Sequence, residues 1–300
     1  MMISCKDLTK KFGEKTALKG VGFQIEDNSI TGLIGRNGSG KTTFMRMASG
    51  LIIPTSGELE VMGMAPYGTI GVAENVIYSF HNYPHPPKMK LQDIKEYYKA
   101  MFPNFDNEFA CNLMKYYSLD YKMKYSALSQ GMMSMFNYSM ALAARSPITF
   151  LDEPMLGMDA KTRKHAYEIL LTEYSLHPRN FIISSHMLNE FDTILSDIIL
   201  IDQGKLIFHK ELDEVSQMAF RVDGDEGMLQ EMTAHMNVLH IHVGEVQNFY
   251  IVEGALTEQI KAKFKVQNLE CSMLRPEDIC IYYSSQKREE DLSCLWNEKN

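Results

Sequence analysis

Residues 35–42 read Gly-Arg-Asn-Gly-Ser-Gly-Lys-Thr and match the phosphate-binding pattern G-x-x-x-x-G-K-[ST] at every position. The apolar stretch 29–34 before them predicts a buried strand, and residues 43–48 after them predict a helix. In that setting the glycines let backbone N–H groups converge on phosphate oxygens at the positive end of a helix. The Lys41 side chain can reach the β- and γ-phosphates, and the Thr42 hydroxyl can hold Mg²⁺. The sequence therefore predicts a nucleoside triphosphate site with contacts from Gly35, Asn37, Gly38, Ser39, Gly40, Lys41, Thr42 and Thr43.

A second motif, Ile-Thr-Phe-Leu-Asp-Glu at residues 148–153, is an apolar run that ends in two acids. In a parallel sheet, both carboxylates would lie at the carboxyl end of the strand, beside the phosphate loop. We expect Asp152 to hold Mg²⁺ through water and Glu153 to polarise the attacking water as a general base. A strand that ends in Asp-Glu is common, so this interpretation depends on its combination with the phosphate loop.

Length and composition narrow the class of protein. The 300 residues suggest one large domain and a small one, and the 45% hydrophobic content is ample for a core. A formal charge of −8 without a basic stripe argues against a nucleic-acid partner. The five cysteines are scattered and lack C-x-x-C spacing, which is typical of reduced thiols. No apolar run approaches the roughly 20 residues that cross a bilayer, so any action at a membrane is expected to go through a partner.

A third motif, Leu-Ser-Gln-Gly-Met at residues 128–132, precedes a helix-like stretch that reaches residue 145. Here the chain resembles the ATP-binding subunits of ATP-binding cassette (ABC) transporters, whose signature is Leu-Ser-Gly-Gly-Gln. The leucine, the serine and the second glycine are kept, whereas Gln130 and Met132 depart from the pattern. The motif begins 87 residues after Lys41, and its position between the other two motifs supports the resemblance.

Further elements follow in the family's order, and the resemblance covers roughly residues 3–215. It implies that Phe12 stacks on adenine, that Asp159 is the conserved aspartate after the acidic motif, and that His186 is the switch histidine near the γ-phosphate. Without the other motifs, Phe12 would be as often a core residue, and a lone histidine after a strand would more often be structural.

One position departs from the family, which places a glutamine after a strand in contact with Mg²⁺ and water. In the best register His81 stands there, with Asn82 one residue further on. Imidazole can bind a metal or a water but is shorter and titrates near neutrality. Three alternatives follow: hydrolysis is slow or pH-sensitive, Asn82 substitutes, or neither residue contacts the nucleotide.

The resemblance implies an α/β P-loop NTPase fold, an ABC cassette over residues 1–216 with a helical subdomain at about 88–145. Residues 217–300 are expected to form a small α+β accessory domain with a polar tail. Strand-like runs at 219–222, 238–243, 249–252 and 266–271 alternate with helix-like runs at 227–236 and 256–264. That βαββαβ order suggests a ferredoxin-like module.

The family mechanism, carried onto these residues, assigns catalysis to Lys41, Glu153 and His186, and the metal site to Thr42, Asp152 and His81. The signature residues Ser129, Gln130 and Gly131, with Asp159, would contact ATP held by a second ATP-binding subunit. Two MgATP are then buried in a head-to-tail homo- or heterodimer whose opening drives a membrane-spanning subunit. The implied location is the cytoplasmic face of the cell membrane, without a nucleic-acid partner.

Within the family, the chain looks most like exporter subunits, in particular bacterial exporters of peptides, bacteriocins and antimicrobials. Two other functions stay open. One is a soluble cassette ATPase acting on ribosomes or DNA, and the other is a regulatory module that clamps ATP with little or no turnover.

Overall fold

The computed structural model describes residues 1–81, 83–185, 194–244 and 247–284. Its backbone contacts divide the chain into two units, Met1–Leu212 and Asp213–Asn300. The sequence predicts a boundary after residue 216, four residues beyond this division. The expected α/β fold is confirmed.

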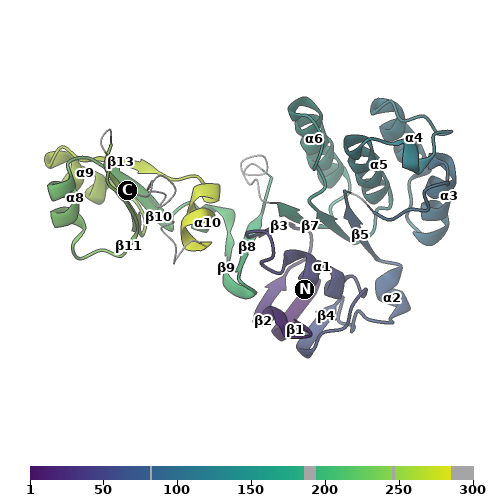
Figure 1. The fold of residues 1–300 in the computed structure, drawn as a ribbon, viewed down its shortest axis with the longest axis horizontal. Coiled ribbons are helices and arrows are strands. Elements are labelled where there is room, and N and C mark those ends of the chain that lie inside the picture. The colour runs from purple at the N-terminus through teal and green to yellow at the C-terminus, as the bar shows by residue number, and fades with distance from the viewer. Residues whose placement is uncertain (82, 186–193, 245–246, 285–300) are drawn as a thin grey trace, which may run out of the picture. The chain divides into compact units, whose positions relative to one another are not determined.

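The first unit is organised by a six-stranded sheet in the order β5-β6-β7-β3-β8-β9 (Figure 1). All neighbours are parallel except β8 and β9, which form a hairpin around Gln203 and Gly204. The four central strands are almost wholly buried, which is why they read as continuous apolar runs. The strands are β3 (Ile30–Ile34), β5 (Val76–Phe80), β6 (Ile148–Asp152), β7 (Asn180–Ser185), β8 (Asp197–Asp202) and β9 (Lys205–Glu211).

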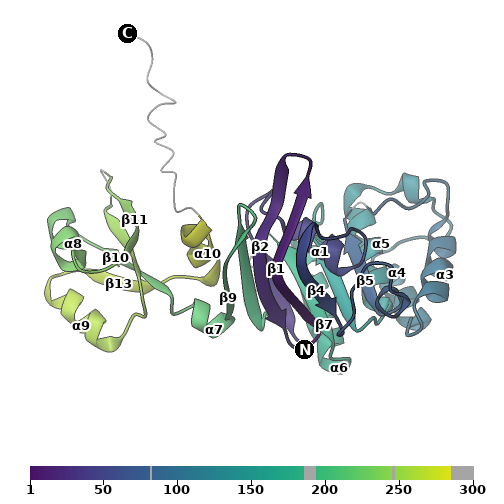
Figure 2. The same ribbon diagram turned by 90° about the horizontal axis from the view of Figure 1, so that it is seen from below.

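A second, antiparallel sheet packs beside the first through helix α1 (Lys41–Ala48). Its order is β2-β1-β4, from β1 (Ile3–Phe12), β2 (Lys15–Ile25) and β4 (Ser56–Val61). Phe44 on α1 contacts Phe23 of β2 at 4.9 Å and Phe150 of β6 at 6.5 Å between ring centroids. The helix therefore lies between the two sheets, as Figure 2 shows from below. Side chains of the helix and of both sheets form one apolar core.

The helical block contains α3 (Leu91–Met101), α4 (Asn107–Tyr116) and α5 (Gln130–Ala143). The apolar spacing predicts helices at 90–101, 107–117 and 130–145, and each observed helix begins and ends within two residues of these bounds. The buried face of α5 includes Phe136 and Tyr138 and packs on α4, β5 and β6. Among its described residues, this unit also contains the short α2 (Ile70–Ala73) and α6 (Ala160–Leu176), which follows β6.

The second unit has a four-stranded antiparallel sheet in the order β11-β12-β10-β13, which is the sheet order of a ferredoxin-like module. Its helices α8 and α9 bury Leu229 and Phe264 against Phe220 and Val252 of the sheet. The elements are α7 (Leu212–Val215), β10 (Ala219–Asp223), α8 (Glu226–Thr233), β11 (Val238–His242), β12 (Phe249–Glu253), α9 (Glu258–Val266), β13 (Glu270–Met273) and α10 (Pro276–Ser284).

The predicted start of the strand at residues 266–271 is wrong, because α9 continues to Val266 and β13 begins at Glu270. Asn268 adopts a left-handed φ of 56°, and the N–H of Leu269 donates to the carbonyl of Phe264 at 3.1 Å. This is a helix-ending turn, which the apolar run alone does not reveal.

Among the residues that the structure describes, no helix combines the length and the apolar character that crossing a bilayer requires.

Candidate functional site

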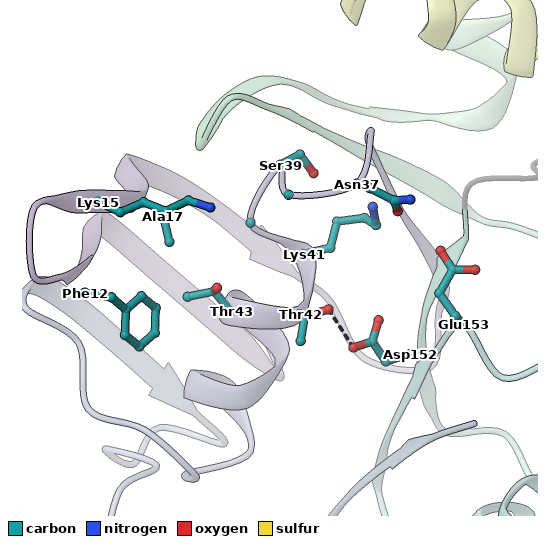
Figure 3. A pocket seen from close by; sticks show the side chains of 12 residues that line it. Phe12, Lys15, Ala17, Asn37, Ser39, Lys41, Thr42, Thr43, Asp152 and Glu153 are labelled. Atoms are coloured by element: carbon teal, nitrogen blue, oxygen red, sulfur yellow. Dashed lines mark hydrogen bonds between the residues drawn. The ribbon is translucent and has the colours of Figure 1, made fainter. Parts of the chain in front are cut away.

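A cavity of about 270 Å³ lies where the phosphate loop meets the carboxyl end of β6 (Figure 3). It brings together side chains that are far apart in the sequence, from Phe12 on β1 to the acids after residue 151. Its lining is Phe12, Lys15, Ala17, Asn37, Gly38, Ser39, Gly40, Lys41, Thr42, Thr43, Asp152 and Glu153.

Lys15 and Ala17 belong to this cavity although the motifs do not predict them. Lys15 pairs with Phe12 across the hairpin between β1 and β2, so both residues reach the same end of the cavity. The available signal is the Gly13-Glu14 turn directly after Phe12. Phe12 is 51% exposed at the edge of the cavity, and its contact with adenine stays a prediction.

Lys41 is buried at the centre of the phosphate loop. Its Nζ donates to the carbonyl of Gly35 at 2.5 Å and to that of Arg36 at 3.2 Å. Burial lowers the pKa of Lys41, and the charges of Glu153 and Asp152 oppose that shift. The loop can close this tightly because a Cβ at Gly35 would lie 2.0 Å from the carbonyl oxygen of Ile201.

Three hydroxyl groups donate to the carboxylate of Asp152. Thr42 Oγ1 lies 2.7 Å and Tyr78 OH 2.8 Å from Oδ2, and Ser184 Oγ lies 2.5 Å from Oδ1. The parallel register explains the meeting, because Asp152 is level with Phe80 on β5 and with Ser184 on β7. Sequence reasoning finds Thr42 but misses Tyr78 and Ser184.

Thr42 and Asp152 supply hard oxygen donors of the kind that Mg²⁺ prefers, so these residues fit such an ion. The described residues contain no cluster of three His, Cys, Asp or Glu side chains that could hold a metal by themselves. A cation here would therefore complete its shell with phosphate oxygens and water.

Glu153 extends into the cavity from a left-handed backbone with a φ of 47°, which is uncommon for a residue other than glycine. Its N–H donates to Ser184, at 3.0 Å to Oγ and at 3.3 Å to the carbonyl oxygen. Backbone strain of this kind is held in place by surrounding structure and tends to occur at functional positions. The role of Glu153 as general base stays a prediction.

His81 follows β5 directly, but its side chain is not among those that line the cavity. The buried Asn137 on α5 donates from Nδ2 to the carbonyls of Phe80 and His81, at 3.1 Å each. The structure thus ties His81 to the helical block through its backbone. Its predicted metal role is untested, and Asn82 and His186 lie outside the described residues.

The signature residues lie outside the cavity. Ser129 caps α5 by accepting from the N–H of Met132 at 3.3 Å, and Asp159 caps α6 by accepting from Thr162 at 2.8 and 2.9 Å. That Ser129, Gln130, Gly131 and Asp159 contact nucleotide on a second copy stays a prediction.

Gly131 carries a testable packing constraint, because a Cβ there would lie 2.5 Å from the carbonyl oxygen of Gly157. We expect Gly131→Ala to lower the free energy of unfolding by about 1–3 kcal/mol through this clash. Gly71→Ala is the matched control, since its Cβ would meet only the flexible end of Met64. That change is expected to be neutral or to stabilise, because alanine favours a helix over glycine. Urea unfolding of both variants measures the contrast, and a stable Gly131→Ala protein contradicts it.

His85 sits among aromatic rings beside Asn137, with Tyr83 and Tyr125 each at 4.8 Å between ring centroids. Its Nε2 lies 3.2 Å from Asn137 Oδ1. Burial lowers the pKa of His85 from 6.5 to about 4, although the bond to Asn137 opposes the shift. Between these pH values the unfolded chain binds a proton that the folded chain excludes.

Stability from neutral His85 is therefore present above pH 6.5 and lost as the pH falls toward 4. We expect wild type to lose about 1–2 kcal/mol more than His85→Gln between pH 7.5 and pH 5, after allowance for partial exposure of the ring. Urea unfolding at the two pH values measures this difference. An identical pH dependence in both proteins contradicts it.

Comparison with known proteins finds a matching family model and relatives that are similar in sequence. The family model described as "ABC transporter" matches residues 18–156. The ABC transporter ATP-binding protein YtrB of Bacillus subtilis is 31% identical over 228 residues, which cover 74% of this chain and 78% of that protein. The linearmycin resistance ATP-binding protein LnrL of the same organism is 27% identical over 238 residues, 75% of this chain and 73% of that protein.

Among solved structures, a dimeric ATP-binding cassette in a post-hydrolysis state with ADP and Pi matches with a TM-score of 0.63. It is 22% identical in sequence, and the match covers 70% of this chain and 99% of that one. This likeness supports the fold.

Proposed function

The chain belongs to the ATP-binding subunits of ABC transporters and is an ATPase, and on that premise we propose that it pairs with a second such subunit around two MgATP and energises a separate membrane-spanning exporter subunit. The observation that carries the proposal is the single cavity that joins Lys41 and Thr42 of the phosphate loop to Asp152 and Glu153.

Five side chains of the cavity have a part in this proposal. Phe12 stacks on adenine, Lys41 binds the β- and γ-phosphates, and the loop N–H groups cradle them. Thr42 and Asp152 hold Mg²⁺, which when bound neutralises charge on the phosphate oxygens. The Glu153 carboxylate accepts the proton of the water that attacks the γ-phosphorus.

Pairing of two copies completes the site. The signature residues at the start of α5 lie away from this chain's own cavity, where they are available to a nucleotide on another copy. The N-terminus of α5 carries a partial positive charge that suits a γ-phosphate. The dimeric solved structure with ADP and Pi shows that a cassette of this fold can assemble in pairs.

The partner surface is proposed on α3. Two aromatic side chains at this helix, Tyr98 and Phe102, are buried in the core. Tyr97 and Met101 are 59% and 44% exposed, and their i, i+4 spacing puts them on one face of α3. An exposed apolar pair on a helix is suited to a hydrophobic segment of a membrane subunit.

Export of a peptide or an antimicrobial is the narrower part of the proposal. It is supported by the similarity to a linearmycin resistance protein and by the resemblance of the signature region to bacterial exporter subunits.

The test begins with steady-state ATP hydrolysis by the purified chain with Mg²⁺. In cells that produce it naturally, the protein is then followed between membrane pellet and supernatant. We expect hydrolysis, and sedimentation with membranes that detergent reverses. A hydrolysing protein that stays wholly in the supernatant would instead favour the soluble cassette ATPase.

A clamp with little turnover is the second candidate, and the place of His81 favours it. This residue stands where the family has a glutamine, and its side chain does not line the cavity. Tight ATP binding without hydrolysis, in the isolated chain and in its membrane complex, would support the clamp.

A further inference from the structure

The carboxylate of Asp152 accepts hydrogen bonds from residues outside the phosphate loop as well as from Thr42 within it. Beside Thr42, its carboxylate accepts from Tyr78 on β5 and from Ser184 on β7. Both bonds are buried in the structure. Neither residue lines the cavity, so neither has a part in the proposal above.

The two carboxylate oxygens are not equally occupied. An ionised carboxylate has about four lone-pair positions, two on each oxygen. Oδ2 accepts from Thr42 and Tyr78, which fills its capacity, whereas Oδ1 accepts from Ser184. Oδ1 is therefore the oxygen with acceptor capacity left for a metal-bound water.

Tyr78 donates to Asp152 from a packed position. Its hydroxyl has one hydrogen to donate, and the carboxylate oxygen Oδ2, 2.8 Å away, can only accept. The ring is 9% exposed and packs on Phe80 at 5.4 Å between centroids. Because β5 pairs with β6 in parallel, with Tyr78 level with Phe150, the hydroxyl extends toward the strand end where Asp152 lies.

We infer that Tyr78 is a positioning residue for the metal site: its hydroxyl occupies Oδ2 of Asp152 and orients the carboxylate so that Oδ1 serves the cation. This inference rests on the proposed function, since it assumes that Thr42 and Asp152 hold Mg²⁺. The residue acts through Asp152 and does not itself touch nucleotide or metal.

Tyr78→Phe tests the inference because it removes one oxygen atom and keeps the packed ring. The probe is Mn²⁺, titrated by electron paramagnetic resonance against protein saturated with a non-hydrolysable ATP analogue. Loss of an outer hydrogen bond to a metal-binding side chain should weaken Mn²⁺ binding about tenfold. Affinity for ATP in EDTA should stay at the wild-type value, which shows that the phosphate loop is intact.

Tyr138→Phe is the matched control, because it also deletes a buried hydroxyl, one that donates to the carbonyl of Ala166 at 2.6 Å and not to Asp152. This control should bind Mn²⁺ as tightly as wild type, whatever it loses in stability. Wild-type Mn²⁺ affinity in Tyr78→Phe would overturn the inference. If the complex of wild-type protein and ATP analogue binds Mn²⁺ no more tightly than the free analogue does, the proposed metal site is overturned. The role of Tyr78 then fails with it.

Discussion

Replacing Glu153 by Gln is expected to lower steady-state ATP hydrolysis at least about 100-fold, because the amide cannot accept the proton of the attacking water. Glutamate and glutamine side chains have the same shape. Both carry a Cβ atom, which is what makes a left-handed backbone unfavourable, so the strain at this position is the same in the variant. The loss should therefore be chemical and should leave ATP affinity near the wild-type value. Phosphate release and ATP titration measure the two quantities separately.

The same substitution is expected to produce a stable dimer with MgATP, because the bound nucleotide persists at the proposed interface. Size-exclusion chromatography with light scattering, with and without nucleotide, reports the mass. Glu60→Gln is the control, since Glu60 is exposed on β4 and away from the cavity. Wild-type turnover in Glu153→Gln would show that Glu153 is not the general base.

The parts of the nucleotide site that lie in one continuous segment could be predicted from the sequence. The phosphate loop and the Asp152-Glu153 strand end are such segments, because a local pattern specifies both the residues and the strand or helix beside them. All of the predicted loop residues except Gly35 line the cavity, and the carbonyl of Gly35 accepts from Lys41.

Contacts between separate strands could not be predicted in this way. Tyr78 and Ser184 reach Asp152 because β5 and β7 flank β6 in a particular register. Buried strands such as β6 and β7 lack the alternation of apolar and polar residues from which a register could be predicted. The placement of Lys15 opposite Phe12 likewise depends on a hairpin. For His81, the family register predicts a side chain at the site, but the cavity lining does not include it. Its metal role stays a prediction.

The error at the end of α9 has a local cause. An apolar, β-branched residue such as Val266 favours a strand in a short window, yet it is 78% exposed at the last turn of the helix. The helix is fixed by Thr257 at its start, which accepts from the N–H of Ile260, and by the burial of Phe264 against the sheet. Tertiary packing thus outweighs the intrinsic preference of the terminal residue.

Lys41→Ala should have the other large effect, a loss of ATP affinity of about 100-fold. The Lys41 ammonium is 6% exposed and lies near two carboxylates, those of Asp152 and Glu153. Without it, phosphate groups would meet uncompensated negative charge in a partly desolvated cavity. They would also lose charge-assisted hydrogen bonds that contribute about 1.5–3 kcal/mol each. Titration with a fluorescent ATP analogue at low and at physiological salt measures the affinity.

Lys15 provides an internal comparison, because it lines the same cavity but is exposed to solvent. Its charge is screened by water and salt, so Lys15→Ala should weaken binding by only about threefold, and less at higher ionic strength. The buried Lys41 should show little salt dependence, since ions do not enter the loop. Equal losses in the two variants would mean that the phosphates do not sit in the loop formed by residues 35–42. The difference between the two lysines thus tests where in the cavity the triphosphate lies.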